Sequence, residues 1–222
     1  METKMKALLI GASGLTGTQC LEKLLNDDDY AKVEIWVRRS VGKAHPRLIE
    51  KIIDFDALKN NTVTDAQHVF CCLGTTIKKA GSQENFYKAD HDYVVTVAEI
   101  AARSGAEKFL YISSIGADSK SKNFYLRTKG KVEDDLKNTF KNGLVIFRPS
   151  MLMGKRQEFR FGELVGKGFM KIFGFLFIGK MKKFRGIEAS TVAGAMIRSA
   201  KSGRTGIDII ESDIIFEIVN NQ

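Results

Sequence analysis

The sequence predicts an α/β fold with a doubly wound, mainly parallel sheet, built as one domain of 222 residues. Short apolar runs alternate with segments of helical periodicity, and the runs are rich in β-branched and aromatic residues, as strands covered on both faces are. A glycine-rich turn stands between the first run and the first periodic segment. No internal repeat or low-complexity linker divides the chain, and hydrophobic residues make up 44% of it, enough for a large core.

Six strands are expected along the chain, the first within the apolar run at 7–10. The others are VEIWV at 33–37, KIIDF at 51–55, VFCCL at 69–73, FLYIS at 109–113 and LVIF at 144–147. The clearest helix begins near Gln83 and reaches Ser104, where Gly105 is a typical stop. Two more helices are expected over 124–137 and 188–200. The connection at 38–49 is too irregular for a crossover helix, and the one at 56–67 is short.

The first strand runs into GASGLTG, in which Gly11, Gly14 and Gly17 are spaced three apart. A strand, a glycine turn and a helix together direct free N–H groups and the positive end of the helix dipole at a pyrophosphate. The alternative is a glycine-rich turn without a ligand, but the flanking strand and helix favour a dinucleotide site. The expected contacts are Gly11, Ser13, Gly14, Leu15, Thr16 and Gly17.

Residues that follow the later strands are the next candidates, because ligands of such sheets bind beyond the carboxyl ends of the strands. Arg38 and Arg39 stand where a carboxylate would bind the ribose of NAD, so they favour the 2′-phosphate of NADP(H). Asp54 is expected at the adenine edge or as a loop cap. The remaining candidates for cofactor contact are Phe55, Leu73, Gly74, Thr75 and Ser113.

Candidate catalytic residues follow the fifth strand. Tyr125 and Lys129 are four residues apart and so share a helix face, a short distance after Ser113 and Ser114. An ammonium beside a tyrosine favours the phenolate, which makes the tyrosine a usable proton donor or acceptor for a carbonyl–alcohol exchange. Ser114 would hold the substrate oxygen, although Ser113 is the alternative. Lys129 and Tyr125 are also expected to contact the cofactor.

Several motifs together resemble the short-chain dehydrogenase/reductase superfamily. They are GASGLTG, the arginine pair, DF at 54–55, CCLGTT, KAG, SSIGAD, YLRTK at 125–129 and RPS at 148–150. Residues 5–155 are most similar to its atypical NAD(P)-binding branch of HTATIP2-type oxidoreductases. The resemblance implies a Rossmann-type fold, NADPH as ligand, Ser114, Tyr125 and Lys129 in the catalytic positions, and a lysine that binds the nicotinamide ribose.

Two departures from that family keep alternatives open. Cys71-Cys72-Leu73-Gly74 replaces the usual Asn-Asn-Ala-Gly, and the interval from serine to tyrosine is short. The first hypothesis is an NADPH-dependent reductase of a small carbonyl compound. The second is an NADPH-binding regulatory or interaction protein with little turnover. The third is an epimerase or dehydratase.

Charge and composition add weaker expectations. The net charge is +9, and residues 155–185 hold nine Lys or Arg against two Glu. This segment belongs to a basic, substrate-side insertion at 150–187, and it is either a solvated face or a contact for an acidic partner or an anionic membrane. No nucleic-acid-binding signature accompanies it. Three cysteines and no visible signal peptide favour the cytoplasm, and three isolated histidines give no metal site.

Overall fold

The computed structural model describes residues 4–58, 62–154 and 186–220. Seven strands form one parallel sheet in the order β3-β2-β1-β4-β5-β6-β9. Their bounds are β1 Met5–Ile10, β2 Tyr30–Val37, β3 Leu48–Ile52, β4 His68–Cys71, β5 Lys108–Ile112, β6 Leu144–Arg148 and β9 Ile207–Glu211. The predicted doubly wound parallel sheet is therefore confirmed.

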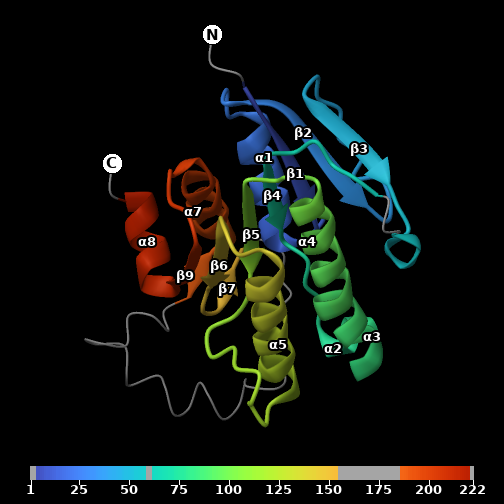
Figure 1. Cartoon of the computed structure of the whole chain (residues 1–222), viewed down its shortest axis with the longest axis vertical. Coiled ribbons are helices and arrows are strands. Elements are labelled where there is room, and N and C mark those ends of the chain that lie inside the picture. Colours follow the sequence, from blue (N-terminus) through green and yellow to red (C-terminus); the bar gives the residue numbers. More distant parts are fainter. Residues whose placement is uncertain (1–3, 59–61, 155–185, 221–222) are drawn as a thin grey trace.

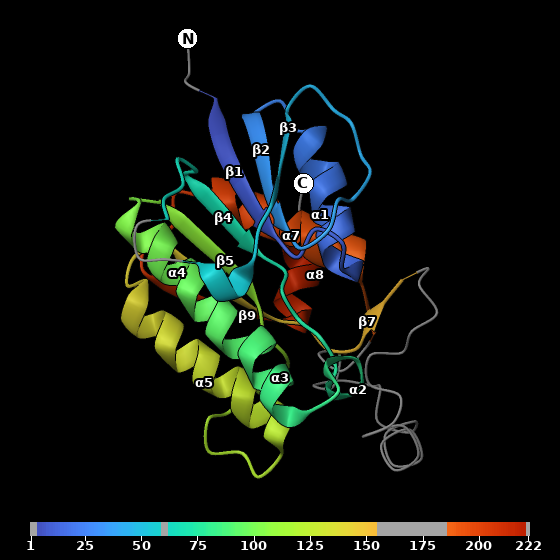
Figure 2. The same cartoon turned by 90° about the vertical axis from the view of Figure 1, so that its right-hand side faces the viewer.

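Helices cover both faces of the sheet (Figures 1 and 2). One layer holds α1 (Leu15–Leu25), α7 (Ala189–Lys201) and α8 (Ser212–Asn220). The other holds α4 (Tyr93–Arg103) and α5 (Phe124–Thr139). Each layer closes its own apolar core against the sheet, and successive strand residues supply the two cores in turn, Leu9 to one and Leu8 to the other. This packing explains why the central strands read as continuous apolar runs.

The helix expected over Gln83–Ser104 is present but composite. It begins as α3 (Gln83–Tyr87), widens into a π-helical turn η2 (Lys88–Asp92) and continues as α4. Ser82 caps its start, accepting a hydrogen bond from the N–H of Asn85 at 3.0 Å. The short helix α2 (Ile77–Ala80) precedes it. A π-helical turn inserts one extra residue, and such turns are frequent at functional sites.

Several predicted boundaries were displaced. The third strand lies three residues earlier than expected, so Asp54 and Phe55 follow it, and Phe55 begins the short 3-10 turn η1 (Phe55–Ala57). No crossover helix joins β2 to β3, as expected. The terminal β9 and α8 were missed. The small parallel pair β7 (Leu152–Met153) and β8 (Ile187–Glu188) was missed too.

Candidate functional site

The turn after β1 has no room for a side chain at Gly11 or at Gly17. Gly11 has φ +83°, a conformation that favours glycine, and a Cβ there would lie 2.6 Å from the carbonyl oxygen of Cys72. A Cβ at Gly17 would overlap the carbonyl oxygen of Gly11. The N–H of Gly14 closes the turn on that same carbonyl at 2.9 Å. The glycines therefore let helix α1 start directly against the ends of β1 and β4.

The first turn of α1 is built to receive an anion. Gly14 is its N-cap and supplies no side-chain cap, and no acidic residue stands in the first turn. The N–H groups of a first helical turn have no partner within the helix, so they and the dipole attract negative charge. Thr16 Oγ1 is buried and has no hydrogen-bond partner among the described residues. An orphaned hydroxyl beside the glycine cradle fits a bound pyrophosphate.

Arg38 and Arg39 lie immediately beyond the carboxyl end of β2, as predicted. Both side chains are exposed, and neither forms an ion pair with another residue that the structure describes. Arg38 lies within electrostatic reach of the Tyr93 hydroxyl. Two uncompensated guanidinium groups at this end of the sheet are well suited to a phosphate.

The residues after β3 form an aromatic corner near Arg38. Phe55 is buried and its ring lies 5.3 Å from the ring of Tyr93, whose hydroxyl donates to Asp56 at 2.6 Å. Asp54 Oδ1 accepts the N–H of Asp56 at 2.9 Å. Asp54 thus caps the turn η1, the alternative role that the sequence left open for it.

The loop after β4 joins the two halves of the site. Leu73, Gly74 and Thr75 follow Cys72, whose carbonyl faces Gly11. The N–H of Thr75 donates to Asp90 Oδ2 at 2.7 Å. Since Asp90 belongs to η2, this loop is tied to the helix on the α4 face.

Ser113 and Ser114 have different surroundings. Ser113 Oγ donates to Glu133 Oε1 at 2.5 Å, inside a buried network that Arg148 completes. Within the part of the chain that the structure describes, Ser114 Oγ makes one long hydrogen bond, of 3.4 Å, to the carbonyl of Ile115. Ser113 is therefore held by the fold, whereas Ser114 has hydrogen-bonding capacity to spare.

Tyr125 and Lys129 occupy the first turns of α5, which begins behind an Asn123 side chain that accepts the Leu126 N–H at 3.1 Å. The Tyr125 ring packs 5.8 Å from Phe86. Lys129 is 3% exposed; its Nζ lies 3.0 Å from Asp90 Oδ1 and donates to the Tyr111 hydroxyl at 3.0 Å. Burial alone would lower the pKa of Lys129, but the Tyr111 oxygen and the Asp90 carboxylate raise it well above the ordinary value.

Sequence reasoning missed the buried acids Asp90 and Glu133. Asp90 is fully buried, and Glu133 is 1% exposed and paired with Arg148 at 2.5 Å. A usable signal existed for Glu133, which stands four residues after Lys129 and so shares its helix face. No comparable signal existed for Asp90, because the π-helical turn changes which residues face inward.

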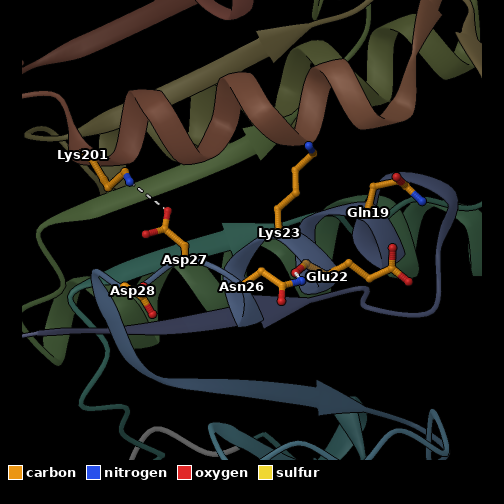
Figure 3. A pocket seen from close by; sticks show the side chains of 7 residues that line it. All are labelled: Gln19, Glu22, Lys23, Asn26, Asp27, Asp28 and Lys201. Carbon is orange, nitrogen blue, oxygen red and sulfur yellow. Dashed lines mark hydrogen bonds and ion pairs between the residues drawn. The ribbon is translucent and has the colours of Figure 1, made fainter.

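A polar hollow of about 550 Å³ lies at the other end of α1, away from the glycine turn (Figure 3). Lys201 forms an ion pair with Asp27 across it at 2.8 Å. None of the predicted site residues lines this hollow. Among the described residues no cluster of acids, histidines or cysteines is suited to a metal ion, and no helix is long and apolar enough to span a bilayer. The whole basic segment 155–185 lies outside the described residues, which include only 150–154 and 186–187 of the insertion that contains it.

Comparisons with known proteins agree with this geometry. Residues 11–167 match the NAD(P)H-binding family. The chain is 33% identical to protein HTATIP2 of Rattus norvegicus over 216 residues, covering 95% of this chain and 87% of that protein. It is 31% identical to the protein fmp52, mitochondrial, of Aspergillus niger, covering 89% and 88%.

Solved structures share the fold at low sequence identity. MoeE5 in complex with UDP-glucose and NAD superposes with a TM-score of 0.68 at 15% identity, covering 97% of this chain and 81% of that one. A UDP-glucose 4-epimerase from Thermotoga maritima with UDP-glucose gives 0.66 at 15% identity, covering 98% and 82%. These structures support the Rossmann-like arrangement of the seven strands.

Proposed function

This chain belongs to the NAD(P)H-binding family, and we propose that it is an NADPH-dependent oxidoreductase that reduces a small carbonyl compound. The observation that carries the proposal is the placement of Tyr125 and Lys129 one turn apart on α5, the helix that comes after β5 and the two serines, Ser113 and Ser114, that follow this strand. A phenolate at Tyr125 would raise the pKa of Lys129, so the two groups lie within electrostatic reach of each other.

The choice of NADPH rests on the arginines after β2. A 2′-phosphate carries charge that NAD lacks, and an Arg–phosphate hydrogen bond is charge-assisted and often bidentate. No carboxylate follows β2 to accept a ribose 2′-hydroxyl. The exposed guanidinium groups of Arg38 and Arg39 thus support NADP(H) over NAD(H).

Each residue has a distinct part in the proposed reduction. Bound NADPH supplies the hydride that the carbonyl carbon accepts. Tyr125 gives the proton to the carbonyl oxygen, Ser114 orients that oxygen by a hydrogen bond, and Lys129 stabilises the resulting phenolate. Because Lys129 stays protonated, the one N–H that is not directed at Asp90 or Tyr111 is available to a ribose hydroxyl. The hydride and the proton together convert the carbonyl group into an alcohol.

The cofactor assignment is tested by titrating the protein with NADPH and with NADH. We expect wild type to prefer NADPH, and Arg38→Ala/Arg39→Ala to weaken NADPH binding about 10- to 100-fold with little effect on NADH, since a hydrogen bond between charged groups contributes roughly 1.5–3 kcal/mol. Arg103→Ala, on the exposed face of α4, is the matched control. Equal affinity for both cofactors in wild type would contradict the assignment.

The reaction is tested by following NADPH absorbance over a panel of aldehydes and ketones. Consumption of NADPH with one alcohol formed per cofactor supports the reductase. Tight NADPH binding without turnover across the panel would instead favour the regulatory alternative.

A further inference from the structure

Asp90 is a buried acid that no part of the proposed reaction yet uses. Its side chain has no solvent exposure, and it holds two groups that are far apart in the sequence. One oxygen accepts the N–H of Thr75 at 2.7 Å, and the other lies 3.0 Å from Nζ of Lys129. Apart from that ammonium, the second oxygen has no partner among the described residues.

The cost of burying Asp90 points to a specific role. Taking a carboxylate and an ammonium out of water costs several kcal/mol for each ion, and mutual attraction repays this only in good geometry. An apolar pair of similar volume would fill the same space at a lower cost in free energy. A fold that needed only packing between η2, β5 and α5 would not require these charges.

We propose that Asp90 is a positioning residue, whose carboxylate holds the Lys129 ammonium charged and in place while it anchors the Thr75 loop of the cofactor site. This inference deepens the proposed function and rests on it for the role of Lys129. The contacts couple a loop on the nucleotide side to a side chain on the chemical side. A substitution in the nucleotide half should therefore affect the chemical half, and the reverse.

Among the residues that the structure describes, the other ionisable groups near Lys129 come from three elements. Tyr111 is on β5, Cys71 on β4 and Tyr125 on α5 itself. Burial raises the pKa of Cys71 to about 12 and also raises that of Tyr111. Both therefore stay neutral between pH 7 and pH 9.5, and Asp90 is the carboxylate that the described residues place beside Lys129.

The first test measures the melting temperature of cofactor-free protein between pH 7 and pH 9.5, for wild type and Asp90→Asn. Breaking one partner of a buried pair in a chain of this length lowers the melting temperature by roughly 6–12 °C at pH 7. Without the carboxylate, burial depresses the pKa of Lys129 below its unfolded value. The unfolded chain then binds more protons, so stability rises with pH.

We therefore expect the gap in melting temperature between Asp90→Asn and wild type to shrink by more than half from pH 7 to pH 9.5. Asp92→Asn, in the same turn but exposed and paired with His91, is the control and should show a constant gap. A constant gap for Asp90→Asn would overturn the proposal, because loss of packing or of the Thr75 hydrogen bond has no such pH dependence. This readout needs no cofactor and no turnover.

A double variant keeps the test decisive if Asp90→Asn folds poorly. Asp90→Asn/Lys129→Met removes both charges, and we expect it to melt higher than Lys129→Met alone, which leaves the carboxylate unpaired. Additive losses in the double variant would overturn the proposal.

The link to the cofactor is tested by NADPH binding. We expect the dissociation constant of Asp90→Asn to rise about tenfold from pH 7 to pH 9.5 while that of wild type changes less than threefold, since one pKa unit corresponds to a factor of ten. Parallel profiles would overturn the coupling. If wild type binds no NADPH, the proposed function fails, while the melting curves still decide the role of Asp90.

Discussion

The two halves of the site both lie at the carboxyl ends of the strands but are built in opposite ways. The nucleotide half, where β1 meets α1, relies on backbone: glycines, a helix start without a side-chain cap, and first-turn N–H groups that have no acceptor within the helix. The chemical half, where β5 meets α5, consists of buried charges, with Lys129 on Asp90 and Glu133 on Arg148. The nucleotide half requires positions without side chains, and the chemical half requires that each buried charge is paired with an opposite charge.

This difference predicts how each half fails. The nucleotide half has no room for an added methyl group at Gly11 or Gly17, whereas the buried pairs of the chemical half cannot lose a charge without leaving its partner uncompensated. Substitutions of the same small size should therefore have effects of different origin in the two halves. The predictions below compare them from the largest expected effect to the smallest.

The largest effect is expected at Gly17. Alanine there would place a Cβ on the carbonyl oxygen of Gly11, and neither backbone can move without opening the turn. We expect Gly17→Ala to lose about 3 kcal/mol or more of unfolding free energy and all measurable NADPH binding. Gly203→Ala is the control, because a Cβ at Gly203 meets nothing within 4 Å. Denaturant unfolding and cofactor titration measure both, and a stable, cofactor-binding Gly17→Ala would contradict this description of the turn.

A comparable but smaller loss is expected in the chemical half at Glu133. Glu133→Gln keeps the size of the side chain but leaves the Arg148 guanidinium without its bidentate carboxylate. Breaking such a buried pair costs about 3–5 kcal/mol, although the partial exposure of Arg148 places this pair at the lower end. Asp134→Asn, its exposed neighbour on α5, should lose less than about 1 kcal/mol. Equal losses in urea unfolding would show that the Glu133–Arg148 pair stabilises the fold no more than an exposed ion pair does.

The smallest effects on stability are expected at the two serines, and they should separate fold from chemistry. Ser113→Ala removes a hydrogen bond to a buried carboxylate and should cost roughly 1.5–3 kcal/mol. Ser114→Ala should cost less than about 0.5 kcal/mol but lower the turnover number by roughly 10²-fold, as loss of an oriented hydrogen bond to a reacting oxygen does. Unfolding curves and NADPH consumption on the same preparations compare the two. The reverse pattern would assign Ser113 to the chemistry.

The sequence predicted the nucleotide half better than the chemical half, for a physical reason. Backbone sites depend on local features, and Gly11 and Gly17 stand next to the strand and helix that they join. The buried charges depend on long-range contacts, since Asp90 meets Thr75 and Lys129 only after η2, β4 and α5 have packed together. The environments of Ser113 and Ser114 could not be predicted from the sequence, because they also depend on long-range contacts.

The errors in the predicted strands also have a physical cause, which is how far each strand is buried. The central strands β4 and β5 are buried along their whole length, and their apolar runs were found within a few residues. The edge strand β9 is only partly buried, its sequence IDIIE mixes isoleucines with acids, and it was missed. The other edge strand, β3, also mixes apolar and charged residues in LIEKI, and it lies three residues before the predicted position. Edge strands obey weaker burial constraints, so their patterns are harder to recognise.

The central claim is that Tyr125 supplies the proton for a reduction by NADPH, and one variant tests it most directly. Tyr125→Phe removes the hydroxyl and keeps the ring that packs on Phe86. Tyr87→Phe, whose ring stacks on His91, is the matched control. For a carbonyl substrate that wild type reduces, we measure NADPH affinity and single-turnover NADPH oxidation. We predict that Tyr125→Phe binds NADPH within about threefold of wild type and oxidises it at least about 10²-fold more slowly, the lower end of what a positioned acid contributes. Full oxidation by Tyr125→Phe would contradict the account.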